Sequence, residues 1–544
     1  MVFCGKPSGG CHACRERKTK CDQVLPGCTQ CKRAKRLCPG YRVPGDLIFR
    51  NESSNVIRKF KAKEAKQKEA AKTLTTPPVS EDESNVEDAS LEVAQQQDRQ
   101  LDVFSLAPSL EDRATGFFVA NYVLGMSGPS RGHLDYIADV SRTQIMDDSL
   151  VSSMKAVGLA GFAHAEHAPS LMKNARYQYV RALKSTNAAL RDPVEAKKDT
   201  TLLAIMILGI FETITGCTTR SLRDWARHVN GAAAVIKLRG PDQIKTPHGR
   251  RMLIQVTASL LINCLQRGVA LPSHIQEYMT AAIKLVGTPD PAFVINDCMM
   301  HFANLRASVL SGKLTDQHEI LRLSLELDAK LLDIVINVPP GWEYQTITTL
   351  EQSDVAYKGR YHLYYDYWIA MIWNALRSLR LLIHELIRDI LLKGFAQRPP
   401  TFHSTEHTAQ FQISTDTLYQ HQEEILLSAA QHMNNFPKAQ DLSVYKSVTS
   451  IPLIAYNELH APLRMSGGSF LIWPLWHAGI LDISTEEVRR FAIKNLNFIG
   501  DTMGIQQAFV LAKSVEERLD IEVWKEGDPP HSNPDYTFDT EVNG

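Results

Sequence analysis

The feature that most constrains the fold of this chain is a run of six cysteines between residues 11 and 38. The gaps between them hold 2, 6, 6, 2 and 6 residues, so the spacing C-x2-C-x6-C occurs twice. Eight lysine and arginine residues lie in the same gaps. Because a segment this short has almost no apolar core of its own, its fold has to be held through the sulfur atoms.

Cysteines in this pattern form either disulfides or a metal site. The first ten residues, MVFCGKPSGG, contain no apolar segment typical of a secretory signal. We therefore expect a reducing compartment, in which such spacing usually means metal. Each C-x2-C pair presents two thiolates at the separation that a tetrahedral zinc ion needs.

The number of thiolates predicts how the metal is shared. Two tetrahedral zinc ions need eight ligand positions, which six thiolates supply if two of them bridge both ions. The repeat predicts that the first cysteine of each half, Cys11 and Cys28, is shared. We thus expect a structural site for two Zn²⁺ ions per chain, with no open position for catalysis and with six ligands, Cys11, Cys14, Cys21, Cys28, Cys31 and Cys38.

The segments CHACRERKTKCD (11–22) and CTQCKRAKRLC (28–38), with Pro26 between them, resemble the fungal binuclear zinc cluster transcription factors. In that family a short helix after the second cysteine enters the major groove of DNA and reads a CGG triplet. Carried over by position, the resemblance implies base contacts from Arg17 and Lys18.

The same resemblance implies phosphate contacts from Arg15 and Lys20. The chemistry of the side chains agrees, because Arg and Lys donate to guanine O6 and N7, and neighbouring cations neutralise phosphates. The second half of the repeat carries further cations, which we assign to phosphate contacts or a nuclear localisation signal, namely Lys32, Arg33, Lys35 and Arg36.

Charge is distributed unevenly along the chain, although the formal net charge is zero. Residues 1–73 contain 18 Lys+Arg against 6 Asp+Glu, and the remainder contains 42 against 54. A basic end on an acidic body favours double-stranded DNA as the partner. We expect no membrane partner, because the longest apolar run, 201–211, is about half of the ~20 residues that a spanning helix needs.

The segments after the cysteines are read as linkers. Residues 56–72 favour a basic helix, suited about equally to phosphate binding and to nuclear import. Family members often dimerise through a coiled coil here, but a heptad started at Val56 meets Lys63 and Gln67 at later seam positions, so homodimerisation is left open. Residues 73–100 are acidic and polar, which predicts disorder.

The large carboxyl-terminal region shows apolar residues at three- and four-residue spacing, as in TTLLAIMILGIFETITG (200–216) and YHLYYDYWIAMIWNALRSLRLLIHELIRDIL (361–391). We expect an all-helical region, either an extended array or two lobes, because some 410 residues exceed one ordinary core. Several stretches, including WARHVNGAAAVIKLRG (225–240) and GSFLIWPLWHAG (468–479), resemble the fungal-specific transcription factor domain. The resemblance implies a regulatory domain.

No catalytic constellation is found in this region. HAEH (164–167) and HELIR (384–388) lack the second histidine of H-E-x-x-H in its place, and no P-loop or G-x-S-x-G elbow occurs. An effector pocket could be lined by Tyr361, Tyr364, Tyr365, Trp368 and Trp373, but an aromatic stripe of that spacing is more typical of a core. An enzyme that borrows the cluster for targeting, or a zinc-folded protein-interaction module, are the competing classes.

The sequence thus predicts a nuclear transcription factor, not an enzyme, that regulates RNA polymerase II genes through CGG-containing sites and contacts the transcription machinery. The resemblance also allows a role as regulator of one pathway, such as a secondary-metabolite cluster. The predicted organisation is a small binuclear zinc cluster joined by a flexible linker to a large all-α domain. Its segments are an arm (1–10), the cluster (11–38), a basic linker helix (39–72), an acidic linker (73–107), the helical domain (108–520) and an acidic tail (521–544).

Overall fold

The computed structural model describes residues 11, 13–14, 17, 19–24, 27–36, 38, 108–286, 291–437 and 465–518. The chain divides into two compact units, residues 1–103 and 104–544. The predicted arm 1–10, linker helix 39–72 and tail 521–544 lie outside the described residues, as does the acidic linker 73–107. The two units are treated separately below.

The first unit is built around sulfur. Its helix α2, Thr29–Arg33, begins directly after Cys28, whose Sγ accepts a hydrogen bond from the amide of Cys31. Four of the cysteines form its buried core: Cys11, Cys14, Cys28 and Cys31.

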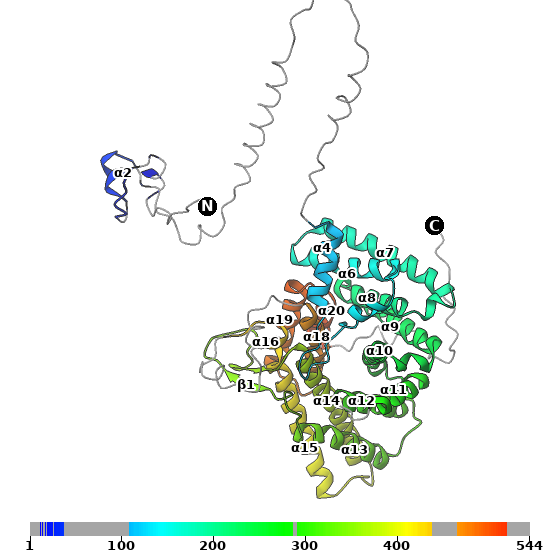
Figure 1. Cartoon of the computed structure of the whole chain (residues 1–544). Coiled ribbons are helices and arrows are strands. Elements are labelled where there is room, and N and C mark those ends of the chain that lie inside the picture. The colour runs from blue at the N-terminus through cyan, green and yellow to red at the C-terminus, as the bar shows by residue number, and fades with distance from the viewer. Residues whose placement is uncertain are drawn as a thin grey trace, which may run out of the picture. The chain divides into compact units, whose positions relative to one another are not determined.

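The second unit is helical, as the apolar spacing predicted (Figure 1). Its helices are α4 Leu110–Tyr122, α5 Ile137–Thr143, α6 Asp148–Ala165, α7 Pro169–Arg191, α8 Asp199–Thr215, α9 Thr219–Arg239, α10 Pro247–Arg267, α11 Ser273–Val286, α12 Pro291–Leu310, α13 Gln317–Ile336, α14 Tyr367–Ala396, α15 Thr405–Leu427, α16 Ala429–His432, α18 Met465–Ile480, α19 Glu486–Thr502 and α20 Gln507–Glu517. Two short 3-10 turns, η2 Glu195–Lys197 and η3 Pro241–Lys245, flank α8 and α10.

One continuous hydrophobic cluster runs through this unit, from Ala114 to Val515. The expected division into two lobes or an extended array is therefore wrong. The reason is that the carboxyl-terminal helices return to the amino-terminal ones: α20 packs on α8 and α9, and Tyr122 of α4 donates to Sδ of Met465 in α18 at 3.1 Å. Such contacts close one core around α8, which is buried along nearly its whole length.

A small antiparallel sheet interrupts the helices at a place where the sequence predicted helix. Strands β1, Gln345–Thr348, and β2, Arg360–Leu363, pair with Gln345 opposite Leu363. The predicted helical stretch 361–391 therefore begins too early. Asp366 sets the start of α14, because its side chain accepts a hydrogen bond from the amide of Ile369 and caps the first turn of the helix. The residues before Asp366 therefore lie outside the helix, and 360–363 pair as a strand.

A buried ion cluster joins α13, α14 and α15. Arg377 of α14 is fully buried and its Nε donates to Glu424 of α15 at 3.0 Å. One turn later, Arg380 donates to Asp328 of α13 at 2.6 Å and to Nε2 of His421 at 2.8 Å. Because a guanidinium only donates, Nε2 of His421 accepts, and its Nδ1–H donates to Glu424 at 2.9 Å.

The charges in this cluster depend on one another. Burial opposes ionisation of Glu424, but the hydrogen bond from His421 and the charge of Arg377 outweigh it and hold the pKa of Glu424 below its usual range. A carboxylate kept charged inside a core stabilises the fold only while its partners remain.

Replacing Arg377 by methionine should therefore lower the free energy of unfolding by ~3–5 kcal/mol, because Glu424, which is mostly buried, would lose the countercharge of Arg377. Urea unfolding followed by circular dichroism measures the change. The double variant Arg377→Met, Glu424→Met should recover much of the loss. As a control, Arg322→Met, which breaks an exposed pair with Glu319, should cost about 1 kcal/mol or less. Equal costs for the two single variants would contradict a structural role for the cluster.

Candidate metal centre and DNA-contact surface

The two halves of the cysteine repeat fold alike. In the first half the amide of Thr19 donates to the carbonyl of Cys14 at 2.9 Å, and in the second the amide of Arg36 donates to the carbonyl of Cys31 at 3.0 Å. Both bonds close a turn that runs from the second cysteine of the half to the fifth residue after it. The 17-residue offset of the sequence repeat is therefore an offset of structure as well.

Six sulfur atoms converge into two sets of four, each with all its ligand atoms within 4.8 Å of one another. One set is Cys11, Cys14, Cys21 and Cys28, and the other is Cys11, Cys28, Cys31 and Cys38. Cys11 and Cys28 belong to both sets, which is the pair that the repeat predicted to be shared.

The separations of the sulfurs suit zinc. The Sγ atoms of Cys11 and Cys28 lie 3.6 Å apart, those of Cys14 and Cys28 3.6 Å, and those of Cys11 and Cys31 3.8 Å. With Zn–S bonds of ~2.3 Å, the edge of a regular tetrahedron of sulfurs is ~3.8 Å. The residues present thus fit tetrahedral zinc with all four positions filled by sulfur.

The protonation of the thiols couples the site to metal. Burial raises the pKa of the Cys11 and Cys14 thiols, so without a cation they hold their protons. Cys21 is the exception, because a hydrogen bond from the amide of Cys11 lowers its pKa. Metal binding must therefore displace protons from the buried sulfurs, and affinity should rise with pH.

Asp22 links the two halves and was not singled out from the sequence. Its carboxylate oxygens accept from the amide of Thr29 at 3.1 and 3.2 Å, at the start of α2 and next to Cys28. The hydrogen bonds with Thr29 lower the pKa of Asp22. The sequence held one hint of this role, because the two halves differ at this position: Asp22 follows the third cysteine of the first half, and Pro39 follows the third cysteine of the second.

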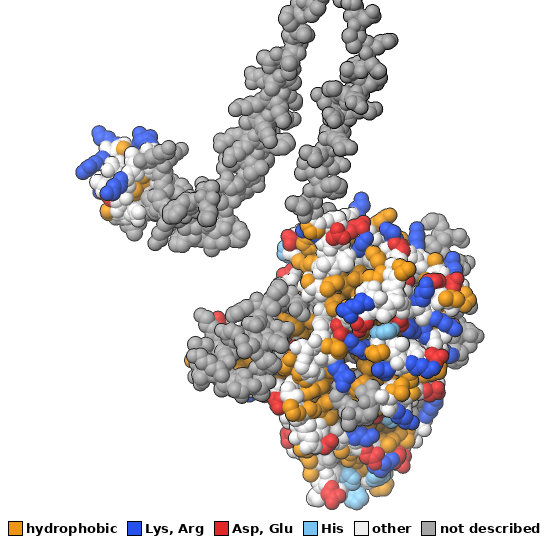
Figure 2. Space-filling view, viewed as in Figure 1, with side chains coloured by type: hydrophobic (Ala, Val, Ile, Leu, Met, Phe, Trp, Pro, Cys, Tyr) orange, Lys and Arg blue, Asp and Glu red, His pale blue; other side chains and the backbone are white. Residues whose placement is uncertain are grey.

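The cations lie outside the sulfur core. Of the four predicted DNA contacts, Arg17 and Lys20 are exposed, whereas Arg15 and Lys18 lie outside the described residues. The second half adds four exposed cations, Lys32, Arg33, Lys35 and Arg36. Figure 2 shows blue side chains on the surface of the small unit. The described part of this unit thus presents positive charge to solvent around a sulfur core.

Comparisons with known proteins find similarity in both units. Residues 9–46 match the model of the fungal Zn(2)-Cys(6) binuclear cluster domain, and residues 139–284 match that of the fungal specific transcription factor domain. The chain thus carries matches to two domains of fungal zinc-cluster transcription factors. These families point to a transcription factor and not to an enzyme, and the cluster domain implies binding of zinc and DNA.

A relative supports the assignment over a longer span. The transcription factor dbaG of Emericella nidulans is 22% identical over 403 residues, which cover 71% of this chain and 86% of the relative. No solved structure matches the chain. The match to the second domain ends within α11, whereas the hydrophobic core of the same unit continues through α20.

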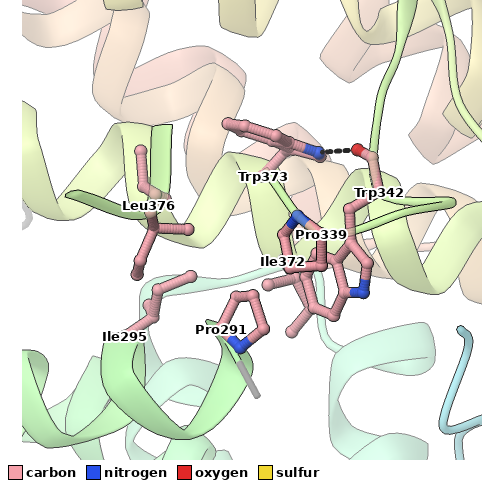
Figure 3. Close-up of a pocket in the computed structure, with 8 residues that line it drawn as sticks. Pro291, Ile295, Pro339, Trp342, Ile372, Trp373 and Leu376 are labelled. Atoms are coloured by element: carbon pink, nitrogen blue, oxygen red, sulfur yellow. Dashed lines mark hydrogen bonds between the residues drawn. The ribbon is translucent and has the colours of Figure 1, made fainter. Parts of the chain in front are cut away.

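One hollow in the described part of the helical unit is small for an effector site. An apolar hollow between α12, α13 and α14 encloses about 220 Å³, including solvent at its mouth (Figure 3). Ligand pockets usually hold roughly 300–1,000 Å³. Of the aromatic stripe only Trp373 lines the hollow, and Tyr361, Tyr364, Tyr365 and Trp368 are buried; the lining is Pro291, Ile295, Ile334, Pro339, Trp342, Ile372, Trp373 and Leu376.

Other tests of the described residues agree with the family. Within them, the groups of three or more Cys, His, Asp or Glu placed to hold a metal are the two cysteine sets. His384, from the HELIR segment, is instead a core residue that bonds Ser414 at 3.0 Å. Among the same residues, no helix combines the length and hydropathy needed to cross a membrane.

Removing the Asp22 carboxylate should weaken zinc binding, because the start of α2 and the neighbouring Cys28 lose their tie to the first half. We expect Asp22→Ala to lower zinc affinity about tenfold, as for other groups that orient metal ligands, with Asp22→Asn in between. Competition with a chromophoric chelator measures it. Gln30→Ala, an exposed change in α2, is the control. An unchanged affinity in Asp22→Ala would show that the tie is dispensable.

Proposed function

We propose that this protein is a sequence-specific regulator of RNA polymerase II genes whose amino-terminal cluster binds two zinc ions and reads CGG-containing DNA in the nucleus. The observation that carries the proposal is the sharing of Cys11 and Cys28 by two four-sulfur sets, with exposed cations around them. Zinc has a structural role here, since sulfur fills every ligand position and leaves none for water. The ions supply the rigidity that a core would otherwise give.

Charge supports the same role. Six thiolates and two Zn²⁺ ions sum to a cluster charge of −2, which on its own would repel DNA. Residues 1–73 contain 18 Lys+Arg against 6 Asp+Glu, which outweighs the charge of the cluster. Zinc ligation thus holds the chain so that its cations, and not its sulfurs, meet the phosphates.

The repeat also separates the two halves in function. With an offset of 17 residues, Lys18 corresponds to Lys35, but Arg17 corresponds to Ala34. At these two matched positions only the first half therefore carries an adjacent basic pair able to donate to neighbouring guanines. We assign base reading to Arg17 and Lys18, and phosphate contacts to Arg15 and Lys20.

The helical domain, which we place at 108–520, receives or transmits a regulatory signal in this proposal. Contacts with the transcription machinery, and control of one pathway such as a secondary-metabolite cluster, are what the family resemblance implies.

Zinc stoichiometry tests the shared ligands. We expect two Zn per full-length chain by native mass spectrometry, and about one in Cys38→Ser, which leaves the other four-sulfur set complete. Cys28→Ser should retain less than one, because both sets lose a ligand. Cys217→Ser, at an exposed cysteine of the helical unit, should keep two. The same loss in Cys28→Ser and Cys38→Ser would argue against bridging.

Selection of bound sequences from a random DNA pool tests the reading of DNA. The zinc-loaded full chain should enrich CGG-containing sites, and a chelator should abolish the enrichment. If the zinc-loaded protein enriches no sequence, the cluster is an interaction module and the proposal fails.

Two single variants separate base reading from phosphate contact in that selection. Lys18→Ala should lose ~1–3 kcal/mol of specific binding and relax the preference at one guanine. Lys20→Ala should weaken selected and scrambled DNA alike and reduce the salt dependence by about one charge. Equal weakening on both DNAs in Lys18→Ala would contradict its assignment as a base reader.

A further inference from the structure

The outer face of α7 is basic and largely unpaired. The helix has five cations and no acidic residue, and all five are exposed: Lys173, Arg176, Arg181, Lys184 and Arg191. Arg181 pairs with Asp148 of α6. The other four make no ion pair with any residue that the structure describes. We call these four cations, together with Tyr177 and Val180 that lie among them on the helix, the α7 face.

The surroundings of the α7 face reinforce its charge. Residues 169–251 contain 15 Lys+Arg against 6 Asp+Glu, although residues 74–544 as a whole are acidic. Tyr179 of α7 bonds Nε2 of His228 of α9 at 3.2 Å, and exposed Arg227, which pairs with Asp224 of the same helix, precedes that histidine. Figure 2 shows many blue side chains over this part of the helical unit.

Apolar side chains lie among these cations. Tyr177 is 69% exposed and Val180 49%, both on α7 between Arg176 and Lys184. Phosphates alone would leave these apolar groups without a partner. A second copy of the same face would place like charges together. The face suits a peptide that combines carboxylates with aromatic side chains.

The chain contains such a peptide in residues 519–544. This segment has seven Asp+Glu against one Lys, with Trp524, Tyr536 and Phe538 among them. The acidic stretch 80–98 has a similar surplus of carboxylates but no aromatic residue. Charge alone would therefore allow either segment to bind. Exposed Tyr177 and Val180 favour residues 519–544, because that segment has the aromatic side chains to contact them.

The route along the chain also allows it. Residue 519 lies shortly after the end of α20 in the sequence, and α20 packs on α8, the helix that packs on α7. A chain of 26 residues spans up to about 85 Å at ~3.3 Å per residue. The 23 residues of α7 extend over about 35 Å at 1.5 Å each, so the segment is long enough to cover the face.

We propose that residues 519–544 dock on the α7 face, with their carboxylates on Lys173, Arg176 and Lys184 and their aromatic side chains against Tyr177 and Val180. Docking withholds an acidic, aromatic segment from other proteins and releases it when a competitor takes the face. The proposal does not depend on how the zinc cluster reads DNA.

The test uses a full-length variant in which all seven acidic residues of 519–544 are changed to amides, which frees the α7 face. A fluorescent peptide of residues 519–544 should bind this variant at least tenfold more tightly than the wild type, whose own segment occupies the face. Fluorescence anisotropy at low salt gives both affinities. Equal affinities would show that the segment does not dock within the chain.

Charge variants of the freed protein locate the site. Lys173→Glu, Arg176→Glu, Lys184→Glu should weaken peptide binding at least tenfold, and the three corresponding glutamine changes should weaken it less. The matched control, Lys284→Glu, Lys313→Glu, Lys330→Glu, alters three exposed lysines on other elements by the same charge and should leave binding within about twofold. Equal losses in both triple variants would overturn the site.

Three competitors identify the occupant. A peptide whose Trp524, Tyr536 and Phe538 are alanine should bind severalfold more weakly, since it lacks the apolar contacts. If a peptide of residues 80–102 binds as tightly as 519–544, the assignment of the segment is wrong. If a DNA duplex displaces the peptide from the freed protein and the α7 triple variant loses DNA affinity, the face is a nucleic-acid surface and the proposal falls.

Discussion

Sharing of Cys11 and Cys28 between two sets of four sulfurs is the constraint on which the amino-terminal unit depends. Six thiols would otherwise complete one tetrahedral site and leave two sulfurs without a role. Sharing also fixes the two halves of the repeat against each other, because the two sets have an edge in common, the 3.6 Å separation of Cys11 and Cys28. Asp22 adds a second tie between the same halves through Thr29.

The helical unit draws its stability from a different source. Its apolar cluster is continuous, and within it Arg377, Arg380, Glu424 and Asp328 are held by hydrogen bonds between three helices. Burial of these charges is tolerated because each lies beside an opposite charge, Arg377 beside Glu424 and Arg380 beside Asp328, and these pairs fix the register of α14 against α13 and α15. The cysteine unit is held by sulfur ligands and the helical unit by apolar packing. A chelator should therefore unfold the first unit, and a denaturant such as urea is needed to unfold the second.

Much of this organisation could be predicted from the sequence, for identifiable reasons. The number of cysteines required two bridging thiolates, and the repeat indicated Cys11 and Cys28 for that role, because a count of ligands needs no knowledge of the backbone. Which four sulfurs form each set came from the structure. Apolar periodicity predicted the helices, since 3.6-residue spacing marks one buried face. It failed at residues 361–363, because an apolar strand and an apolar helix look alike over so few positions. The decisive element there was the cap at Asp366.

Other features depend on contacts between distant residues and could not be read from local patterns. The single core follows from the return of α20 to α8 and α9, a pairing that no spacing reveals. The tie from Asp22 to Thr29 requires the turn between two half-repeats to be known. The pairing of Arg380 with Asp328, 52 residues away, is likewise set by how α13 packs on α14. Whether a segment forms a helix is set largely by residues close to one another in the sequence, whereas the way helices pack depends on residues far apart in it.

The difference in charge density between DNA and residues 519–544 determines which of the two binds each basic surface, the cations around the zinc cluster or the α7 face. DNA presents one charge per ~1.7 Å of helix axis, far denser than seven acidic residues over 26 positions, so the tail is a poor competitor for the cations around the cluster. At the α7 face the tail has the advantage of its tether, which sets an effective concentration on the order of millimolar. A contact with an intrinsic Kd near 100 µM would then be about nine-tenths occupied.

The cations of the α7 face are exposed, so the salt of a physiological solution, in which the Debye length is about 8 Å, screens the contact and keeps it reversible. Tyr177 and Val180 supply the part of the affinity that salt does not weaken, and thereby distinguish an aromatic acidic segment from a polyanion.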